Sequence, residues 1–500
     1  LSAALQAAEN GCNVKLVSSL PSERAQSVMA EGGINAALNT KDENDSPEEH
    51  FTDTIKAACG LADPNAVWGM TQAAPELVHW LLKLGVKFNM SGYDDVDLRN
   101  FGGQKKKRTA FAQSDTGKQI MTAMIDAVRR KEASGMVERF SHHSFLTLRL
   151  CGNICCGCVI RDEYSQETVE LPGDAVIVAT GGMHGLFGNT TGSLSNTGEV
   201  TAELFRLGVP LANGEMIQYH PTTVKCGGKR MLISEAARGE GGRLFAMKDG
   251  KQWYFMEEKY PELGNLMPRD ITAREIWKVS HESEVFLDMT EISEEIISNK
   301  LSGLADDCMT YLHKDIRKEP VSVLPGIHYF MGGILVDEQH RTPIQNLYAA
   351  GECCAQYHGA NRLGGNSLLG ALYGGRVAAK SACEQADVVD LSCATQIDFP
   401  PASQISEIKQ LNKVMQETMG VVRNENTLLN GIQTVQALTG NLPLLGMAVL
   451  KSALARKESR GAHWREDYPK SNDDDYLKTT VARFDGKQIQ ISFVPVPERR

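Results

Sequence analysis

The feature that most constrains the fold is a strand-like pattern that occurs three times along the chain. The residues Asp174–Gly182 (DAVIVATGG) and Ile344–Glu352 (IQNLYAAGE) are each apolar runs that end in a small-residue turn. The segment Asn13–Ser19 (NVKLVSS) is a third such run, and it follows a helical pattern that Gly11 ends. Buried strands joined to helices in this way predict an α/β fold.

Short turns after buried strands let the backbone approach a large ligand. Three of them in this order predict a Rossmann-like domain for a flavin dinucleotide. A strand and a G-x-G-x-x-G turn would come before Leu1 in such a domain, so we expect that the N-terminal strand and glycine turn are missing from this chain. Ser18 and Ser19 stand where an acidic residue usually holds a ribose, and a hydroxyl contact is weaker.

The pattern changes between the runs Asp174–Gly182 and Ile344–Glu352, where the chain becomes polar with short helices. The chain must therefore leave the α/β domain and return to it. We expect residues 1–217 and 325–385 to form the FAD-binding domain, with an α+β capping domain inserted at residues 218–324. A helical domain is predicted at residues 400–465, and a mixed C-terminal segment at 466–500.

Composition limits the class of protein. A chain of 500 residues is expected to form two to four domains. A formal charge of −10 with no basic domain argues against nucleic-acid binding. No run of 18 apolar residues and no signal peptide is visible, so we predict that nothing in this chain spans a membrane.

Cysteine usage favours a reducing compartment, because 12 cysteines in 500 residues are too sparse for a disulfide scaffold. Cys155 and Cys158 form one C-x-x-C pair in a hairpin-like pattern, and no second pair follows at zinc spacing. We expect these cysteines to be structural and predict no metal site in this chain.

Five short motifs carry residues that are typical of chemistry on small anions. One of them, HGANRLGGNSLLGALYGG, places a single arginine, Arg362, among six glycines and so predicts an anion held beside a flat group. The others are QYHPT (218–222), SEAARGEGG (234–242), MPRD (267–270) and PGIHYFMGGI (325–334).

Taken together, these motifs resemble the flavoprotein subunit of succinate dehydrogenase and fumarate reductase. The resemblance covers nearly the whole chain, from AEGGINAAL to RKESRGAHWREDYP. It is nearest to the forms that pair with a cytochrome b membrane anchor. L-aspartate oxidase shares many of the motifs and remains an alternative, as does a flavin-binding assembly component without turnover.

The resemblance implies a role for each motif residue. His220 and Ser234 match the family's ligands of one substrate carboxylate, and His328 and Arg362 match those of the other. Arg269 matches the residue that transfers the proton, and Glu235 and Arg238 match the rest of its relay. Their three-residue separation predicts that Glu235 and Arg238 share one helix face.

The resemblance also implies the cofactor contacts. Ser367 and Leu368 are expected to offer backbone N–H groups to the flavin at a helix start, and Glu352 is expected on the nucleotide side. The remaining expected FAD contacts are Ser18, Ser27, Glu31, Gly32, Gly33, Ala179, Thr180, Gly181 and Glu199.

The position that matches the family's flavin-linking histidine is Gln26, which cannot form that bond. We therefore predict non-covalent FAD, and a lower flavin potential that favours fumarate reduction. The resemblance further implies an iron–sulfur subunit and a cytochrome b-type anchor as partners. These partners would hold the chain peripherally on the cytoplasmic side of the cell membrane.

Overall fold

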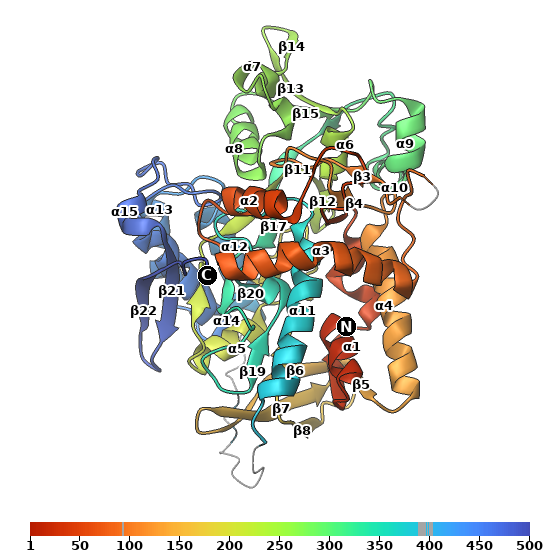
Figure 1. The fold of residues 1–500 in the computed structure, drawn as a ribbon. Helices are drawn as coiled ribbons and strands as arrows, with labels where there is room; N and C mark the ends of the chain where they lie inside the picture. Colours follow the sequence, from red (N-terminus) through yellow and green to blue (C-terminus); the bar gives the residue numbers. More distant parts are fainter. Residues whose placement is uncertain (93–94, 389–396, 398, 400–403) are drawn as a thin grey trace.

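We describe a computed structural model of the chain, which covers residues 1–92, 95–388, 397, 399 and 404–500. The predicted start of the helical domain, at residues 400–403, lies outside the described residues. Figure 1 shows the arrangement, with α11 (Asn366–Gln385) running through the middle of the molecule beside α1 (Ser2–Glu9) and α3 (Pro64–Leu84). Among the described residues, no helix is both long and apolar enough to cross a bilayer.

Two pairs of parallel strands carry the predicted turns. Strand β1 (Val14–Ser18) pairs with β5 (Val137–Ser141), and β9 (Val176–Val178) pairs with β19 (Leu347–Ala349). The second pair joins residues that are far apart in sequence, so the chain does return after the polar insert. Beside them, the predicted hairpin at the cysteine cluster is an antiparallel sheet of β6 (His143–Cys151), β7 (Ile154–Asp162) and β8 (Thr168–Pro172).

The N-terminal helices cover this region because their apolar faces share one core. The helix α3 begins after Asp63, whose side chain accepts hydrogen bonds from two backbone N–H groups, and it ends at Gly85 with φ of 102°. It packs with α1, α11 and α4 (Thr116–Ala133), and its buried residues include Met70, Val78 and Leu81. The neighbouring elements are α2 (Pro47–Ala57), β2 (Ile34–Asn35), β3 (Leu98–Arg99), β4 (Thr109–Ala110) and α5 (Glu199–Arg206).

The polar insert has its own hydrophobic cluster, which runs from Ile233 to Val323 and takes in Phe101 from the N-terminal part. The insert opens with β11 (Ile217–Cys226), which pairs with β12 (Lys229–Leu232) and with β17 (Leu324–Phe330). Its other elements are α6 (Glu235–Gly239), β13 (Arg243–Lys248), β14 (Lys251–Trp253), α7 (Phe255–Lys259), α8 (Arg269–Val279), β15 (Val285–Asp288), α9 (Glu294–Lys300), α10 (Ser302–Asp307) and β16 (Val321–Ser322). In Figure 1 most of these elements project from the top of the molecule.

The C-terminal part packs against the body and is not a separate appendage. Helices α12 (Ile405–Thr418), α13 (Glu425–Val435) and α14 (Asn441–Ala455) share a hydrophobic cluster with Phe187 and Ile217. The last hairpin then completes a five-stranded sheet in the order β20-β18-β10-β21-β22. Its strands are β10 (Leu211–Ala212), β18 (Gly333–Leu335), β20 (Cys354–Ala355), β21 (Lys478–Phe484) and β22 (Ile489–Pro495).

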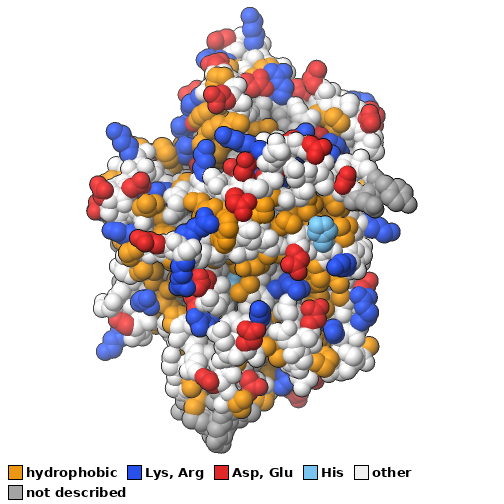
Figure 2. Space-filling model, viewed as in Figure 1, with side chains coloured by type: hydrophobic (Ala, Val, Ile, Leu, Met, Phe, Trp, Pro, Cys, Tyr) orange, Lys and Arg blue, Asp and Glu red, His pale blue; other side chains and the backbone are white. Residues whose placement is uncertain are grey.

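The surface carries both signs of charge. Figure 2 shows acidic and basic side chains interspersed over the face in view, with apolar side chains between them. That face therefore presents no extended field of one sign.

A buried network of hydrogen bonds and ion pairs connects the C-terminal part to Glu215, just before β11. The Glu215 carboxylate accepts hydrogen bonds from Arg456 Nε at 2.7 Å and from the Thr480 hydroxyl at 2.5 Å. The Glu215 carbonyl accepts from Arg423 at 2.7 Å. The side chains of Glu215 and Arg456 are both fully buried. Because Glu215 lies two residues before β11, the network fixes the strand that carries His220.

We expect Glu215→Gln to lower the free energy of unfolding by about 3 kcal/mol, because the buried Arg456 guanidinium loses one of its two carboxylate partners. Urea denaturation measures this change. The control is Glu294→Gln, which breaks the more exposed Arg317–Glu294 pair and should cost less than about 1 kcal/mol. Equal effects from the two variants would contradict the prediction.

Candidate active site

The predicted site residues surround one cavity of about 2030 Å³. They come from β1, the segment before β2, the turns after β9 and β19, the start of α5, the polar insert, β17, and α11 with the turn before it. The predicted residues that line the cavity are Ser18, Ser27, Glu31, Gly32, Gly33, Ala179, Thr180, Gly181, Glu199, His220, Ser234, Glu235, Arg269, His328, Glu352, Arg362, Ser367 and Leu368. Arg238 lies behind this lining and reaches it through Glu235.

The centre of the site is an ion pair between Arg269, the first residue of α8, and Glu235, the first residue of α6. Arg269 donates from Nε and Nη2 to the same carboxylate oxygen, at 2.8 and 2.6 Å. Both side chains are almost entirely buried. The pairing holds the guanidinium at the cavity wall with a fixed orientation.

Glu235 is also held by two other groups. Its second oxygen accepts from the Gly102 N–H at 3.1 Å and lies 3.5 Å from Arg238 Nη2. Burial alone would raise the pKa of Glu235, but Arg269 and Arg238 lower that pKa below its usual value. Glu235 is therefore ionised at neutral pH. Glu235 and Arg238 also lie on one face of α6, as predicted, although this helix spans only five residues.

Gln218 is a site residue to which the sequence analysis gave no role. Its amide oxygen accepts from Arg269 Nη1 at 3.1 Å. Its amide nitrogen donates to Asn361 Oδ1 at 2.9 Å and to the Arg362 carbonyl at 2.8 Å. One buried amide thus connects the two arginines of the site. Its place in the QYHPT motif, two residues before His220, was the only signal that could have identified it.

His220 on β11 and His328 on β17 lie together because their strands pair antiparallel. Their ring centroids are 5.2 Å apart, edge to face. Burial, followed by the charge of Arg269, holds the pKa of each ring well below its usual range, so both are neutral. His328 Nδ1 hydrogen-bonds the Thr191 hydroxyl at 2.8 Å, while the buried Nε2 of His220 has no partner among the described residues.

Arg362 lies against the face of Tyr329, with its guanidinium carbon 4.3 Å from the ring centroid. Its Nε is buried and has no hydrogen-bond partner among the described residues. Burial and the positive charge of Arg269 lower the pKa of Arg362 to about 9. A positive group so placed would gain free energy from an anion in the cavity.

Glycines form the wall at the other end of the cavity. A Cβ on Gly33, whose φ is 131°, would come 2.5 Å from the Ala110 carbonyl oxygen. A Cβ on Gly181 would come 2.6 Å from Asn196, and one on Gly182 would come 2.6 Å from Glu352. Side chains at these positions would displace their neighbours, and at Gly33 and Gly181 the backbone itself lines the cavity.

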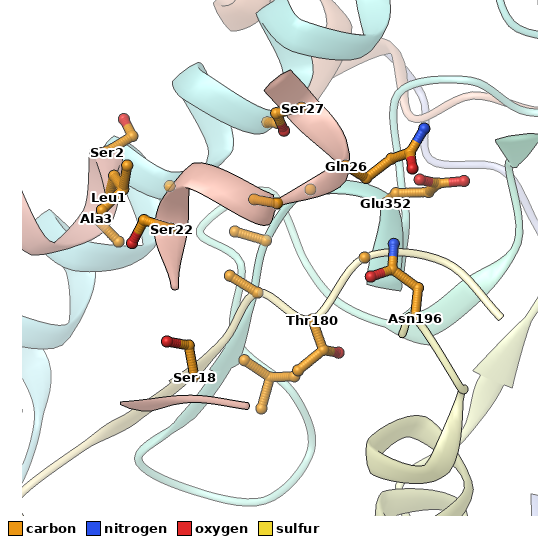
Figure 3. A pocket seen from close by; sticks show the side chains of 18 of the residues that line it. Leu1, Ser2, Ala3, Ser18, Ser22, Gln26, Ser27, Thr180, Asn196 and Glu352 are labelled. Carbon is orange, nitrogen blue, oxygen red and sulfur yellow. The ribbon is translucent and has the colours of Figure 1, made fainter. Parts of the chain in front are cut away.

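Figure 3 shows this end of the cavity, where Gln26, Thr180, Asn196 and Glu352 face a common space from separate elements. Gln26 begins the short helix that precedes Ala30. Glu352 is held because its carboxylate accepts from the Phe330 N–H at 3.0 Å. Ser18 Oγ, further along the cavity, is buried without a partner among the described residues.

These observations fit an elongated dinucleotide ligand. The glycine wall admits close approach of a flat group, and the buried polar atoms of Ser18, Arg362 and His220 need partners that the described residues do not supply. By contrast, no group of three His, Cys, Asp or Glu side chains that could hold a metal is found among the described residues. In the cysteine cluster, Cys155, Cys156 and Cys158 are free, and Cys151 is disulfide-bonded.

Comparisons with known proteins decide the family. A model described as "FAD binding domain" matches residues 1–368, and one described as "Fumarate reductase flavoprotein C-term" matches residues 438–499. The succinate dehydrogenase flavoprotein subunit of Bacillus subtilis is 37% identical over all of this chain and 96% of its own length. The chain belongs to the succinate dehydrogenase and fumarate reductase flavoprotein family. It is therefore an FAD-dependent oxidoreductase.

Other relatives agree with this assignment. The 8-methylmenaquinol:fumarate reductase flavoprotein subunit of Wolinella succinogenes is 31% identical over 98% of this chain and 88% of its own length. The structure of the E. coli quinol fumarate reductase subunit FrdA superposes with a TM-score of 0.89 at 26% identity, covering 99% of this chain and 95% of that one. The predicted membership is confirmed, and the fold is that of the family's flavoprotein.

Glu31, which lines the cavity, has a raised pKa. Glu31 is buried, and burial together with Asp307 and Asp115 raises its pKa to about 8 despite the opposing charge of Arg99. Arg99 also donates to the Glu31 carbonyl at 2.9 Å and so holds the backbone here. Glu31 is accordingly neutral at pH 7.

We predict that Glu31→Gln stabilises the protein more at pH 8 than at pH 5. The folded protein keeps the Glu31 proton up to about pH 8, whereas the unfolded chain releases it near the ordinary value of 4.5. Stability due to this group therefore falls as pH rises across that interval, and glutamine has no proton to lose. Melting temperatures at the two pH values test this, and an equal shift at both would contradict it.

Proposed function

We propose that this flavoprotein interconverts succinate and fumarate with bound FAD. The observation that carries the proposal is the position of Arg269, which Glu235 fixes at the cavity wall while Gln218 connects it to the Arg362 backbone. The relatives named above are succinate dehydrogenase and fumarate reductase subunits. This favours the proposal over L-aspartate oxidase and over an assembly component without turnover.

The dicarboxylate would be held at both ends. His220 and Ser234 would bind one carboxylate. His220 Nδ1 lies 3.1 Å from the Thr222 carbonyl and 3.3 Å from the Thr222 N–H, and the unpartnered Nε2 is a donor to the substrate in the tautomer in which Nδ1 accepts from that N–H. His328 and Arg362 would bind the other. Because both rings are neutral, the histidines contribute hydrogen bonds, and Arg362 contributes the positive charge.

Arg269 would carry the proton to or from the substrate carbon. An arginine is a weak acid, so it needs a path that replaces its proton at once. Glu235 accepts two hydrogen bonds from Arg269 and lies next to Arg238, which gives a three-residue relay away from the cavity. The relay is buried, so water does not compete with it.

FAD, when bound, accepts or supplies the hydride at the other methylene carbon. The backbone N–H groups of Ser367 and Leu368 at the start of α11 would hold its pyrimidine edge, and that helix end favours negative charge. Glu352 and Ser18 would contact its nucleotide part. The other proposed contacts are Ser27, Glu31, Gly32, Gly33, Ala179, Thr180, Gly181 and Glu199.

We also propose that residues 1–217 and 325–385 form the FAD-binding domain and that residues 218–324 form a capping domain. The insert at 218–324 supplies His220, Glu235 and Arg269, and the segment at 325–385 supplies Arg362. A cap that closes over the substrate would exclude water from the hydride and proton transfers.

The proposed partners are an iron–sulfur subunit and a cytochrome b-type membrane anchor, which would hold the chain peripherally at the cytoplasmic face of the membrane. The support is the family, since the matched E. coli chain is a quinol fumarate reductase subunit. Electrons would leave or reach the FAD through the iron–sulfur partner.

We expect Arg269→Lys or Arg269→Ala to abolish turnover of succinate and fumarate while FAD stays bound, because Arg269 acts on the substrate proton. Arg362→Ala should mainly weaken dicarboxylate binding, with a smaller loss of rate from misplacement. Steady-state assays with the flavin absorbance spectrum measure both. An Arg269 variant with near parental fumarate reduction would exclude the assigned role.

We also propose that the FAD is non-covalent, because Gln26 cannot form the histidyl bond of the membrane-bound relatives. Loss of that bond lowers the flavin potential and favours fumarate reduction. Acid denaturation of the full-length protein should release all flavin fluorescence from the polypeptide. Flavin that stays with the polypeptide would contradict both the non-covalent attachment and the inferred direction.

A further inference from the structure

A second layer of side chains lies behind the turn that joins Arg362 to α11. Asn35, at the end of β2, is completely buried there. Its side-chain nitrogen donates to the Gly364 carbonyl at 2.7 Å and to Asn366 Oδ1 at 2.8 Å. Its backbone N–H donates to the Gly365 carbonyl at 3.1 Å. Asn35 therefore binds three consecutive residues of the turn.

The hydrogen bonds around Asn35 have a fixed donor direction. The Thr109 hydroxyl accepts from Gln104 at 3.0 Å and donates to Asn35 Oδ1 at 2.6 Å. Past Asn35, the Asn366 amide nitrogen donates to the Thr54 hydroxyl at 3.0 Å, and Thr54 donates to a backbone carbonyl of its own helix, α2, at 2.7 Å. Each of the side chains Thr109, Asn35, Asn366 and Thr54 thus accepts a hydrogen bond from the group before it and donates one to the group after it.

His50 supports the same direction from α2. Its Nε2 lies 2.9 Å from Asn366 Oδ1, which already accepts from Asn35. Burial lowers the pKa of His50 to about 3, so the ring is neutral and carries one proton. Because Asn35 Nδ2 also donates to the Gly364 carbonyl, it is a donor toward Asn366, and the His50 proton must then lie on Nε2 for the ring to donate to the same atom. Asn366 Oδ1 accordingly receives two hydrogen bonds and can only be an oxygen.

The turn itself leaves no room for another arrangement. Gly365 has φ of 83°, and a Cβ there would overlap the Asn35 amide. A Cβ on Gly364 would come 3.0 Å from Phe101 and 3.1 Å from Glu235. The two glycines thus let the turn pass between Asn35 on one side and the catalytic carboxylate on the other.

We propose that Asn35 is a positioning residue for the active site. Its amide fixes the turn that carries Arg362 and starts α11, and so it sets the distance between the bound dicarboxylate and the flavin. The inference rests on the proposed function for the dicarboxylate, but its flavin part depends only on α11. It assigns to Asn35 a role through the turn, without contact with substrate.

The variant Asn35→Asp separates hydrogen-bond direction from shape. Aspartate has nearly the same volume, but its ionised form offers only acceptors to the Gly364 carbonyl and Asn366 Oδ1. It must be protonated to donate, so its pKa should rise well above the ordinary value of about 3.9. The active site of this variant should then deteriorate as pH rises, whereas a defect of shape would be the same at every pH.

The experiment uses the full-length protein with bound FAD and malonate as an unreactive dicarboxylate. Malonate affinity is measured from the flavin absorbance change at pH 6 and pH 8. We expect the ratio of variant to parental dissociation constants to grow at least about tenfold between these values. A difference of one unit between the pKa of the introduced carboxyl with and without malonate corresponds to that change in affinity. The malonate-free flavin band of the variant should shift with pH relative to the parent.

Two further variants guard against a simple folding defect. Thr109→Val removes one hydrogen bond to Asn35 and should weaken malonate binding several-fold, on the order of one lost buried hydrogen bond, at both pH values. Thr147→Val is the matched control, since the buried Thr147 hydroxyl donates to Glu203 at 2.6 Å away from the cavity. It should lower the melting temperature comparably and leave malonate affinity and the flavin band unchanged.

Two results would overturn the inference. One is an Asn35→Asp protein that follows the parent at both pH values in malonate affinity and in the flavin band. The other, which decides the matter if Asn35→Asp does not fold, is a Thr109→Val protein that behaves like Thr147→Val. If the parent itself does not bind malonate, the proposed dicarboxylate function fails, and the flavin band alone then decides the role of Asn35.

Discussion

The buried carboxylate of Glu235 is the group on which the rest of the site depends. It accepts from Arg269 on α8, lies beside Arg238 on its own helix, and accepts from Gly102 in the N-terminal part of the chain. A buried charge without partners costs several kcal/mol, so these segments must come together for any of them to be stable. The polar insert is thereby joined to the body of the protein at the same point where Arg269 reaches the cavity.

Burial also determines the charge of the cavity. His220 and His328 are neutral because desolvation and Arg269 oppose a further positive charge. The buried Nε of Arg362 has no hydrogen-bond partner among the described residues, and the guanidinium lies on Tyr329. A small dianion would supply the missing charge and would satisfy the buried donors. The proposed dicarboxylate is consistent with these unpaired groups.

Two buried sets of side chains support this arrangement. The ionic network of Glu215 and Arg456 fixes the start of β11, which carries Gln218 and His220. The hydrogen-bond chain through Asn35 fixes the turn that follows Arg362. Both sets are buried, and they act on the site through the strand and the turn that they hold.

The sequence by itself determined the residue types and the order of the motifs, because short-range patterns of apolar, glycine and charged residues decide strands, turns and helix starts. The β6–β7 hairpin, the strands that end at Ser18 and Ala349, and the family were all predictable in this way. Only the tertiary structure decided that Gln218 joins the two arginines, that Arg238 stands behind the lining, and that the C-terminal hairpin completes the sheet of β10. These facts depend on register and packing between residues far apart in sequence. The protonation states of Glu31 and of the histidines depend on desolvation, which has no local signal in the chain.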